Sequence, residues 1–193
     1  MDDHQQVRRR DSSASRAALL DAAAELFAER GYDRTTVRDI AGRAGVNQAL
    51  LFRYFGSKEA LYAAVVARAG RDKLAEVPPN ELFAQLLRGI LDRQAGQDHS
   101  SQIMLRSSAE DVSVKAIGQE LGQDYIRALS VLTDAPEADL RAHLVLAWIV
   151  GIDLMRADGG LSPLASANPE QVVACVLPAV RTLLERIKDI SPE

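Results

Sequence analysis

The feature that most constrains the fold of this chain is an apolar periodicity of three to four residues that no proline interrupts before position 78. Apolar side chains between residues 18 and 27 share one face when the chain turns once in about 3.6 residues, as in an α-helix. No stretch alternates apolar and polar residues over the length of a strand. The sequence therefore predicts an all-α fold.

The size and the hydropathy of the chain exclude several classes of protein. Its 193 residues correspond to about one to one and a half ordinary domains, which excludes a large multidomain enzyme. The longest uncharged apolar run covers residues 144–152 and is shorter than the roughly 18 residues that a membrane span needs. The first dozen residues lack the apolar segment of a secretory signal. We therefore expect a cytoplasmic protein without a membrane span.

Capping signals mark the helices of the first part of the chain. Ser12 or Ser13 is expected to cap the first helix, and Gly31 to end it in the left-handed conformation. A second, short helix follows a threonine that has Asp39 three residues after it, an approximate capping box. The third helix is expected over residues 48–55.

The remaining helices follow from caps, prolines and apolar spacing. Ser57 is expected to cap the fourth helix, the double proline within residues 77–80 to end it, and Asn80 to cap the next. Further helices are expected at about 81–95, 100–108, 112–132, 136–157 and 169–188, which makes about nine in all. Pro178 lies inside the last one and either kinks it or breaks it. Cys175 lies in an apolar stretch and is expected to be a buried thiol.

Two short helices joined by a glycine-containing turn and followed at once by another helix are the layout of a helix-turn-helix in a three-helix bundle. The inward positions expected of the first short helix are Val37, Ile40, Ala41 and Ala44. Those expected of the second are Leu51, Phe52 and Phe55. The positions left for other contacts are Gln48, Ala49, Arg53 and Tyr54. Gln can bind an adenine edge, Arg a guanine edge and an Ala methyl group a thymine methyl group, so these residue types suit a DNA major groove.

The charge of the chain is divided unevenly along its length. Residues 1–70 hold 11 Lys and Arg against 9 Asp and Glu, whereas the whole chain has a net charge of −4. A basic N-terminal part followed by an acidic remainder is compatible with contact to phosphates at one end only. Helix-turn-helix geometry also occurs in modules that bind protein, so a helical adaptor or a small-molecule-binding protein without a role on DNA stays open at this point.

The run LLDAAAELFAERGYDRTTVRDIAGRAGVNQALLFRYFGSKEALYAAV resembles the N-terminal domain of the tetracycline-repressor (TetR) family of bacterial one-component regulators. The resemblance rests on the Gly-Tyr after the first helix, the Thr-Thr before the second and the Tyr-Phe-x-x-Lys-Glu at the entrance to the fourth. It implies that the helix beginning near Gln48 is the recognition helix. The base contacts that it implies are Arg38, Gln48, Ala49 and Leu50. The phosphate contacts that it implies are Thr36, Asn47, Arg53, Tyr54 and Lys58. Phe52 stands where the family often has Tyr, so one hydroxyl contact is absent.

The last two long helices are apolar on nearly every face, and such helices must be buried on every face. One face is therefore expected to meet a second copy of the chain, as the resemblance also implies; the alternative is a pair of central core helices in a monomer. The expected interface residues are Leu144, Trp148, Ile152, Val173, Leu177, Val180 and Leu184.

The resemblance further implies a small-molecule effector, of unknown identity, bound between the middle helices. Candidate pocket residues are polar or adaptable side chains on otherwise apolar helices, although each suits an ordinary core position as well. They are Met104, Arg106, Tyr125, His143, Trp148 and Met155.

These observations combine into one expectation. The chain is expected to have a flexible basic tail over residues 1–12, a helix-turn-helix DNA-binding domain over 13–58 and a larger helical effector-binding and dimerisation domain over 59–193. The arginines at 8–10 either follow a minor groove or stay solvated. The three histidines are scattered without metal-ligand spacing, and no phosphate loop or nucleophile elbow is present. We therefore expect no enzyme, cofactor or metal, and instead a homodimeric repressor that binds a palindromic double-stranded operator.

Overall fold

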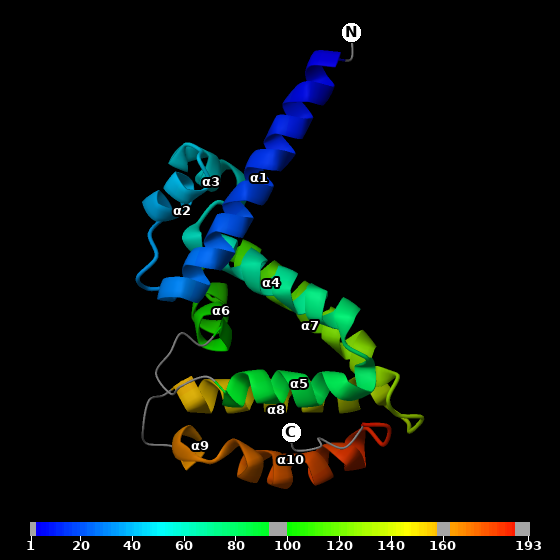
Figure 1. Cartoon of the computed structure of the whole chain (residues 1–193). Helices are drawn as coiled ribbons and strands as arrows, with labels where there is room; N and C mark the ends of the chain where they lie inside the picture. The colour runs from blue at the N-terminus through cyan, green and yellow to red at the C-terminus, as the bar shows by residue number, and fades with distance from the viewer. Residues whose placement is uncertain (1–2, 93–99, 158–162, 188–193) are drawn as a thin grey trace.

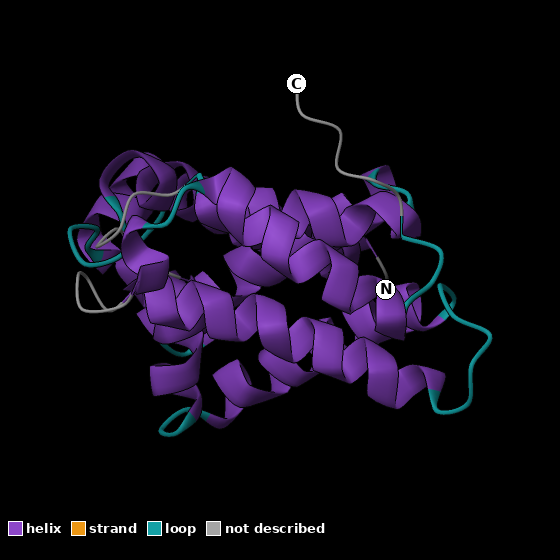
Figure 2. Cartoon of the chain, turned by 90° about the horizontal axis from the view of Figure 1, so that it is seen from below, coloured by secondary structure: helices purple, strands orange, loops and turns teal. Residues whose placement is uncertain are grey.

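The computed structural model describes residues 3–92, 100–157 and 163–187, with side chains from residue 12 onward except at residue 165, and the described residues form helices without any strand (Figures 1 and 2). The first five helices are α1 (Asp3–Arg30), α2 (Val37–Arg43), α3 (Gln48–Phe55), α4 (Lys58–Glu76) and α5 (Pro79–Leu91). The other five are α6 (Ser100–Ser108), α7 (Val112–Ser130), α8 (Ala138–Ala157), α9 (Pro163–Ser166) and α10 (Pro169–Leu183). The expected all-α fold is confirmed; the four-residue helix α9 is the one that the sequence did not predict.

The head of the molecule, by which we mean α1, α2 and α3, packs around one apolar cluster. The members of this cluster on the head helices with no exposed surface or almost none are Leu19, Ala23, Leu26, Ile40 and Leu51. Three further residues complete the cluster from helices outside the head: Leu61 and Tyr62 of α4, and Ile103 of α6. Gly31 ends α1 with a φ of 79°, as predicted, and its N–H donates to the carbonyl of Phe27 at 2.9 Å.

The first helix begins earlier than the sequence indicated. It starts at Asp3, so the predicted cap at Ser12 or Ser13 is wrong. The residues before Ser12 include glutamine and three arginines and contain no proline or glycine, so the helix continues through them at little cost. The arginines at 8–10, for which a minor-groove contact or solvation is expected, have side chains outside the described part of the chain.

The body of the molecule, α4 to α10, is arranged in two tiers. Helices α4 and α7 run together diagonally below the head, and α5, α8 and α10 lie beneath them (Figure 1). A glycine allows α4 and α7 to approach closely, because a Cβ at Gly70 would lie 2.8 Å from Cδ1 of Leu121. The larger core is formed by the lower tier together with the C-terminal part of α7 and includes Leu82, Phe83, Leu87, Leu129, Val145, Val180 and Leu184, all of them almost fully buried.

Several helix ends in the body differ from the sequence-based expectation. Helix α5 begins at Pro79 without a side-chain cap, so Asn80 lies inside the first turn and the prediction that it caps the helix is wrong. Proline suits a first helical position because its φ is already helical and it has no N–H to leave unbonded. Helix α10 runs through Pro178 and ends at Leu183, which excludes a break at the proline. Both Pro178 and Ala174, whose carbonyl loses its donor, are exposed, so water can replace the missing hydrogen bond.

Polar contacts join the head to the body, among them the following three. The Ser57 hydroxyl, in the turn after α3, donates to Oδ2 of Asp111 at 2.8 Å, immediately before α7. The ammonium group of Lys58 donates to the carbonyl of Tyr32 at 2.7 Å, and Arg68 pairs with Asp21 at 2.6 Å. Among the described helices, none has the length and apolar character that crossing a membrane requires.

Candidate nucleic-acid interface and neighbouring cavity

The two short helices of the head are held by side-chain caps at both of their N-termini. Thr36 and Asp39 form the predicted capping box of α2: the Thr36 hydroxyl accepts from the Asp39 N–H at 3.2 Å, and Oδ2 of Asp39 accepts from the Thr36 N–H at 3.1 Å. Hydrogen bonds from the side chain and backbone of Thr36 lower the pKa of Asp39. Asn47 caps α3, with Oδ1 accepting from the Ala49 N–H at 2.8 Å. Gly45 makes the turn between the helices with a φ of 66°.

Helix α3 has one buried face and one exposed face. Leu51 and Phe55, one turn apart, point into the head and are 0% and 9% exposed. The exposed face consists of Gln48, Ala49, Phe52 and Arg53. Phe52 is 50% exposed, so its predicted place in the core is wrong. It follows Leu51 by about 100° around the helix axis, which takes it out of the buried face that Leu51 and Phe55 share.

The predicted base contacts lie on the surface of the head. Gln48 and Ala49 form the exposed first turn of α3, and Leu50 beside them is half-buried against the head core. Arg38 is exposed on α2. The structure thus brings Gln48 and Ala49 together at the N-terminal end of α3. It adds Phe52, which the sequence analysis assigned to the core, to the exposed face of this helix.

The side chains predicted to contact phosphates differ in whether they already form contacts within the protein. The side chains of Thr36 and Asn47 are exposed, yet their oxygen atoms cap α2 and α3. Tyr54 is half-buried on the head core. Lys58 holds the carbonyl of Tyr32, and its Nζ lies 4.0 Å from the centre of the Tyr32 ring. Arg53 is exposed in the last turn of α3, and its guanidinium group is in no hydrogen bond or ion pair within the described part of the chain.

The second arginine of α2, Arg43, is paired with carboxylates. Arg43 binds Glu29 at 2.6 Å and Glu25 at 3.4 Å. The hydrogen bond with Glu29 raises the pKa of Arg43 and lowers the pKa of Glu29. Arg38 and Arg53 are therefore the arginines of α2 and α3 that the described residues leave available to an anionic partner.

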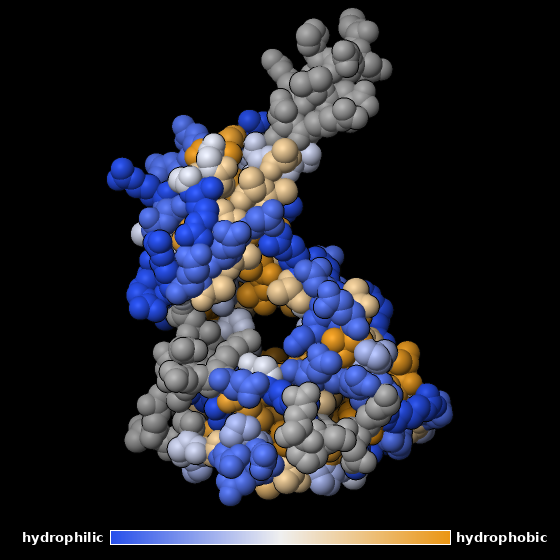
Figure 3. All heavy atoms as spheres, in the orientation of Figure 1, coloured by the Kyte–Doolittle hydropathy of each residue, from blue (hydrophilic) through white to orange (hydrophobic). Residues whose placement is uncertain are grey.

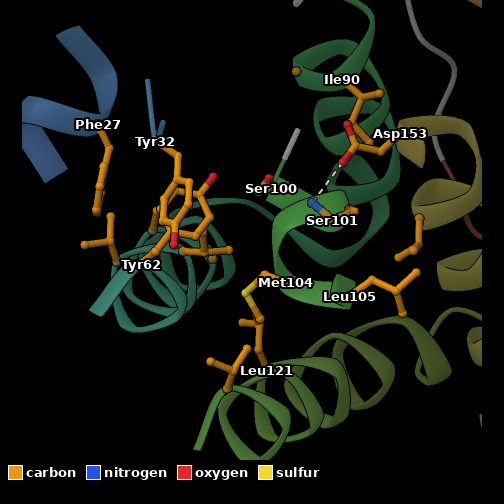
Figure 4. A pocket seen from close by; sticks show the side chains of 18 of the residues that line it. Phe27, Tyr32, Tyr62, Ile90, Ser100, Ser101, Met104, Leu105, Leu121 and Asp153 are labelled. Carbon is orange, nitrogen blue, oxygen red and sulfur yellow. Dashed lines mark hydrogen bonds between the residues drawn. The ribbon is translucent and has the colours of Figure 1, made fainter. Parts of the chain in front are cut away.

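A cavity of about 1350 Å³ lies between the head and the body. It is bounded by the end of α1 and by α4, α5, α6, α7 and α8. Figure 3 shows an opening between the upper and lower parts of the molecule. Phe27, Tyr32 and Tyr62 form an aromatic cluster on the head side, with ring centres 4.9–5.7 Å apart (Figure 4). The apolar part of the opposite wall includes Met104, Leu121, Leu146 and Ile149.

Polar and charged side chains interrupt this apolar lining, and those that are buried include Asp153, Tyr125 and Tyr32. Asp153, 1% exposed, accepts a hydrogen bond from the backbone N–H of Ser101 at 3.2 Å (Figure 4). The Tyr125 hydroxyl donates to the carbonyl of Gly70 at 3.4 Å, and burial raises the pKa of Tyr125. Burial and the hydrogen bond from its hydroxyl to Oε1 of Glu59, 2.7 Å long, raise the pKa of Tyr32.

Of the six predicted pocket residues, Met104 and Tyr125 line this cavity. The other four are exposed and are not part of its lining: Arg106, His143, Trp148 and Met155. The sequence reasoning missed Phe27 and Tyr62, which it treated as ordinary core positions or did not single out. It also missed Asp153, although an acid inside an otherwise apolar helix was a visible signal.

An apolar stripe runs along the outer face of α8. Leu140, Leu144 and Trp148 recur every four residues and are 53%, 44% and 39% exposed, and Met155 extends the stripe. Ile152, Leu177, Val180 and Leu184 are instead buried in the core of this same chain, so they do not form an outer surface, and Val173 is half-buried. The predicted burial of Cys175 is wrong: its thiol is exposed, because α10 turns Val172, Leu177 and Val180 inward.

Comparison with known proteins gives matches over most of the chain. The profile described as "Bacterial regulatory proteins, tetR family" matches residues 19–65, and the profile "Tetracyclin repressor-like, C-terminal domain" matches residues 80–184. An HTH-type transcriptional repressor of Mycobacterium tuberculosis is 30% identical over 177 residues, which are 88% of each chain. The HTH-type transcriptional repressor AcnR of Corynebacterium efficiens is 35% identical over 186 residues, covering 89% of this chain and 93% of AcnR. The crystal structure of a TetR transcriptional regulator from Rhodococcus sp. RHA1 has a TM-score of 0.68 at 20% identity, covering 91% of this chain and 99% of that one.

Proposed function

The chain belongs to the TetR family of DNA-binding transcriptional regulators, and we propose that it is a repressor that binds a palindromic operator as a homodimer and leaves it when a small-molecule effector binds. We assign DNA binding to residues 13–58 and effector binding and dimerisation to residues 59–193. Repressors among its relatives support the direction of the regulation.

The observation that carries the proposal is the exposed face of α3. The capped first turn of this helix presents Gln48 and Ala49, and the last turn presents Arg53. In a major groove Gln48 would bind an adenine edge through two hydrogen bonds, and Arg38 a guanine edge. Arg53 would hold a phosphate, which positions the helix without selecting a sequence.

A second copy of the chain would cover the apolar stripe of α8. The stripe extends over about four turns of helix and consists of Leu140, Leu144, Trp148 and Met155. Apolar residues scattered singly on a surface would not recur so regularly. A two-fold axis through this stripe would pair it with itself and would present two heads together. Two recognition helices about 34 to 36 Å apart would then read successive major grooves of a palindrome.

The cavity is the candidate effector site. Its apolar and aromatic walls suit a large, mostly apolar compound that also carries polar groups, because Asp153, the tyrosines and charged side chains such as Lys73 and Lys115 share the lining. Because Phe27 and Tyr32 belong to the head and Leu146 and Ile149 to the body, an occupant would contact both parts. A coupling of roughly 1 to 3 kcal/mol between effector and DNA would be enough to switch a promoter.

The test is footprinting on the DNA that flanks the chain's own gene, followed by affinity measurements at several salt concentrations. Phosphate contacts predict that the logarithm of the affinity falls with the logarithm of the salt concentration, with a slope of about −0.9 per neutralised phosphate. Gln48→Ala and Arg38→Ala should each reduce the preference for operator over random DNA by about 1 to 3 kcal/mol.

Arg53→Ala should instead weaken operator and random DNA alike and reduce the salt slope by about one phosphate. Arg127→Ala, an exposed arginine on α7, is the matched control and should change neither. A chain that protects no DNA at any salt concentration would favour a helical adaptor or a small-molecule-binding protein. Equal effects of all three head variants on both kinds of DNA would contradict the roles assigned here.

A further inference from the structure

Phe52 stands out on the head because a large apolar ring is exposed to water in the second turn of α3. It has 50% of its surface exposed, while the other exposed large apolar side chains of the described residues all belong to the body. The head does not require the ring for its core, since Leu51 and Phe55 already fill the inner side of the helix at 0% and 9% exposure. An apolar ring on a polar, DNA-facing surface calls for a partner that is itself apolar.

The position of Phe52 on α3 indicates which part of a DNA partner its ring would contact. Side chains of an α-helix lean toward the N-terminus, so the ring at position 52 lies over the turn that contains Gln48 and Ala49. This is the end of α3 that would enter the major groove. The apolar feature that a major groove offers is the 5-methyl group of thymine, and phenylalanine is among the residues that contact it.

We propose that Phe52 is a specificity-determining residue that contacts a thymine methyl group beside the base pair read by Gln48; this inference rests on the proposed function. A phenylalanine has no hydroxyl group to donate to a phosphate, so its contact contributes to sequence preference and not to general affinity. Burying one methyl group corresponds to about 0.8 kcal/mol, or about a fourfold change in affinity for each half-site.

The experiment removes that methyl group from the DNA and leaves every hydrogen bond in place. Within the footprinted operator, each thymine in turn is replaced by deoxyuridine, symmetrically in both half-sites, and the affinity is measured for the wild-type protein and for Phe52→Ala. We expect one position at which deoxyuridine weakens wild-type binding by about tenfold or more over the two half-sites. With Phe52→Ala the same replacement should have no effect.

Two further variants make the assignment specific. Ala49→Gly removes the other methyl group on the exposed face, so a thymine read by Phe52 should keep its effect in this variant, whereas one read by Ala49 should lose it. Phe52→Gln replaces the ring by a polar side chain and should lose the methyl effect as Phe52→Ala does, which preserves the test if Phe52→Ala fails to fold. Leu105→Ala, at a residue of α6 that is 61% exposed, is the control for removing an exposed apolar side chain and should leave the deoxyuridine profile unchanged.

The possible failures are distinguishable. A protein that protects no DNA overturns the proposed function and this inference together. An operator that is bound tightly, but with the same deoxyuridine profile for wild type and Phe52→Ala, overturns only the role of Phe52. A Phe52→Ala variant that weakens operator and random DNA equally would place the ring against the sugar-phosphate backbone and would also overturn it.

Discussion

The hydrogen bond between Ser57 and Asp111 predicts a measurable energetic coupling between the head and the body. The Ser57 hydroxyl donates to Oδ2 of Asp111 at 2.8 Å and accepts from the Ala60 N–H at 2.9 Å, so it joins the two parts and caps α4 at once. Oδ1 of Asp111 accepts from the Ser113 N–H at 2.8 Å and so caps α7. Each of these two side chains therefore serves two elements.

Ser57→Ala removes a helix cap, worth about 1 kcal/mol, and a hydrogen bond to a charged acceptor, worth about 1.5 to 3 kcal/mol. Because both residues are only half-buried, we take the low end and expect a loss of about 2 to 3 kcal/mol in the free energy of unfolding. Asp111→Asn keeps Oδ1 as the cap of α7 and changes the atom that faces Ser57. A double-mutant cycle of the two substitutions should give a coupling energy of about 1 kcal/mol.

The coupling should also depend on pH. The hydrogen bond from Ser57 is the largest of the influences that lower the pKa of Asp111, followed by the backbone N–H of Ser113. A carboxyl group whose pKa is lower in the folded state stabilises the fold above its unfolded pKa, about 3.9 for Asp. The difference in stability between wild type and Ser57→Ala should therefore be constant near neutral pH and shrink as the pH falls below about 4.

Urea unfolding measures these free energies. All variants are compared at one protein concentration, because association would make the stability depend on concentration. Val112→Ala, at a residue that is 83% exposed at the start of α7, serves as a control for local effects on that helix. A coupling energy near zero, or a difference that stays constant down to pH 3, would refute the reasoning.

Two other predictions concern the body. Trp148→Glu should place a charge in the apolar stripe of α8 and convert a dimer into a monomer of 21.0 kDa, as measured by light scattering. The control Gln123→Glu on α7 should leave the mass unchanged. A wild-type mass already at the monomer value would contradict the dimer. Leu121→Arg should place a charge in the cavity wall and weaken binding of the fluorophore anilinonaphthalene sulfonate by tenfold or more. The control Ala116→Arg, at an exposed residue of α7, should leave dye binding unchanged. Equal losses in the two variants would show that the dye binds elsewhere.

The helix-turn-helix was predictable because its signals are local. The Thr36–Asp39 capping box and the serine cap at Ser57 are read from residues three positions apart, and both are present. Phe52 was not predictable in the same way. Three apolar residues among positions 51–55 are equally compatible with the core, and only the packing of α3 on α1 decides which of them faces outward.

The cavity and the outer surface depend on contacts that are distant in the sequence. Ile152, Val180 and Leu184 looked like interface residues because their helices are apolar on nearly all sides, yet they fill the core between α8, α10 and α5. The cavity wall combines Phe27 with Ile149, which no local pattern connects. Periodicity gives the angle of a side chain around its own helix and says nothing of the neighbour that the helix will have.

Tyr32 contacts both the cavity and the start of α4. Its ring lines the cavity, while its carbonyl holds Lys58 and its hydroxyl holds Glu59, the first two residues of the helix that follows α3. A compound that pushes this ring aside must therefore either stretch the hydrogen bond from its hydroxyl to Glu59 and separate the ring from Nζ of Lys58, or carry the start of α4 with it. Movement at the cavity wall would thus reach the base of α3 through a single amino acid, without passing along the length of any helix.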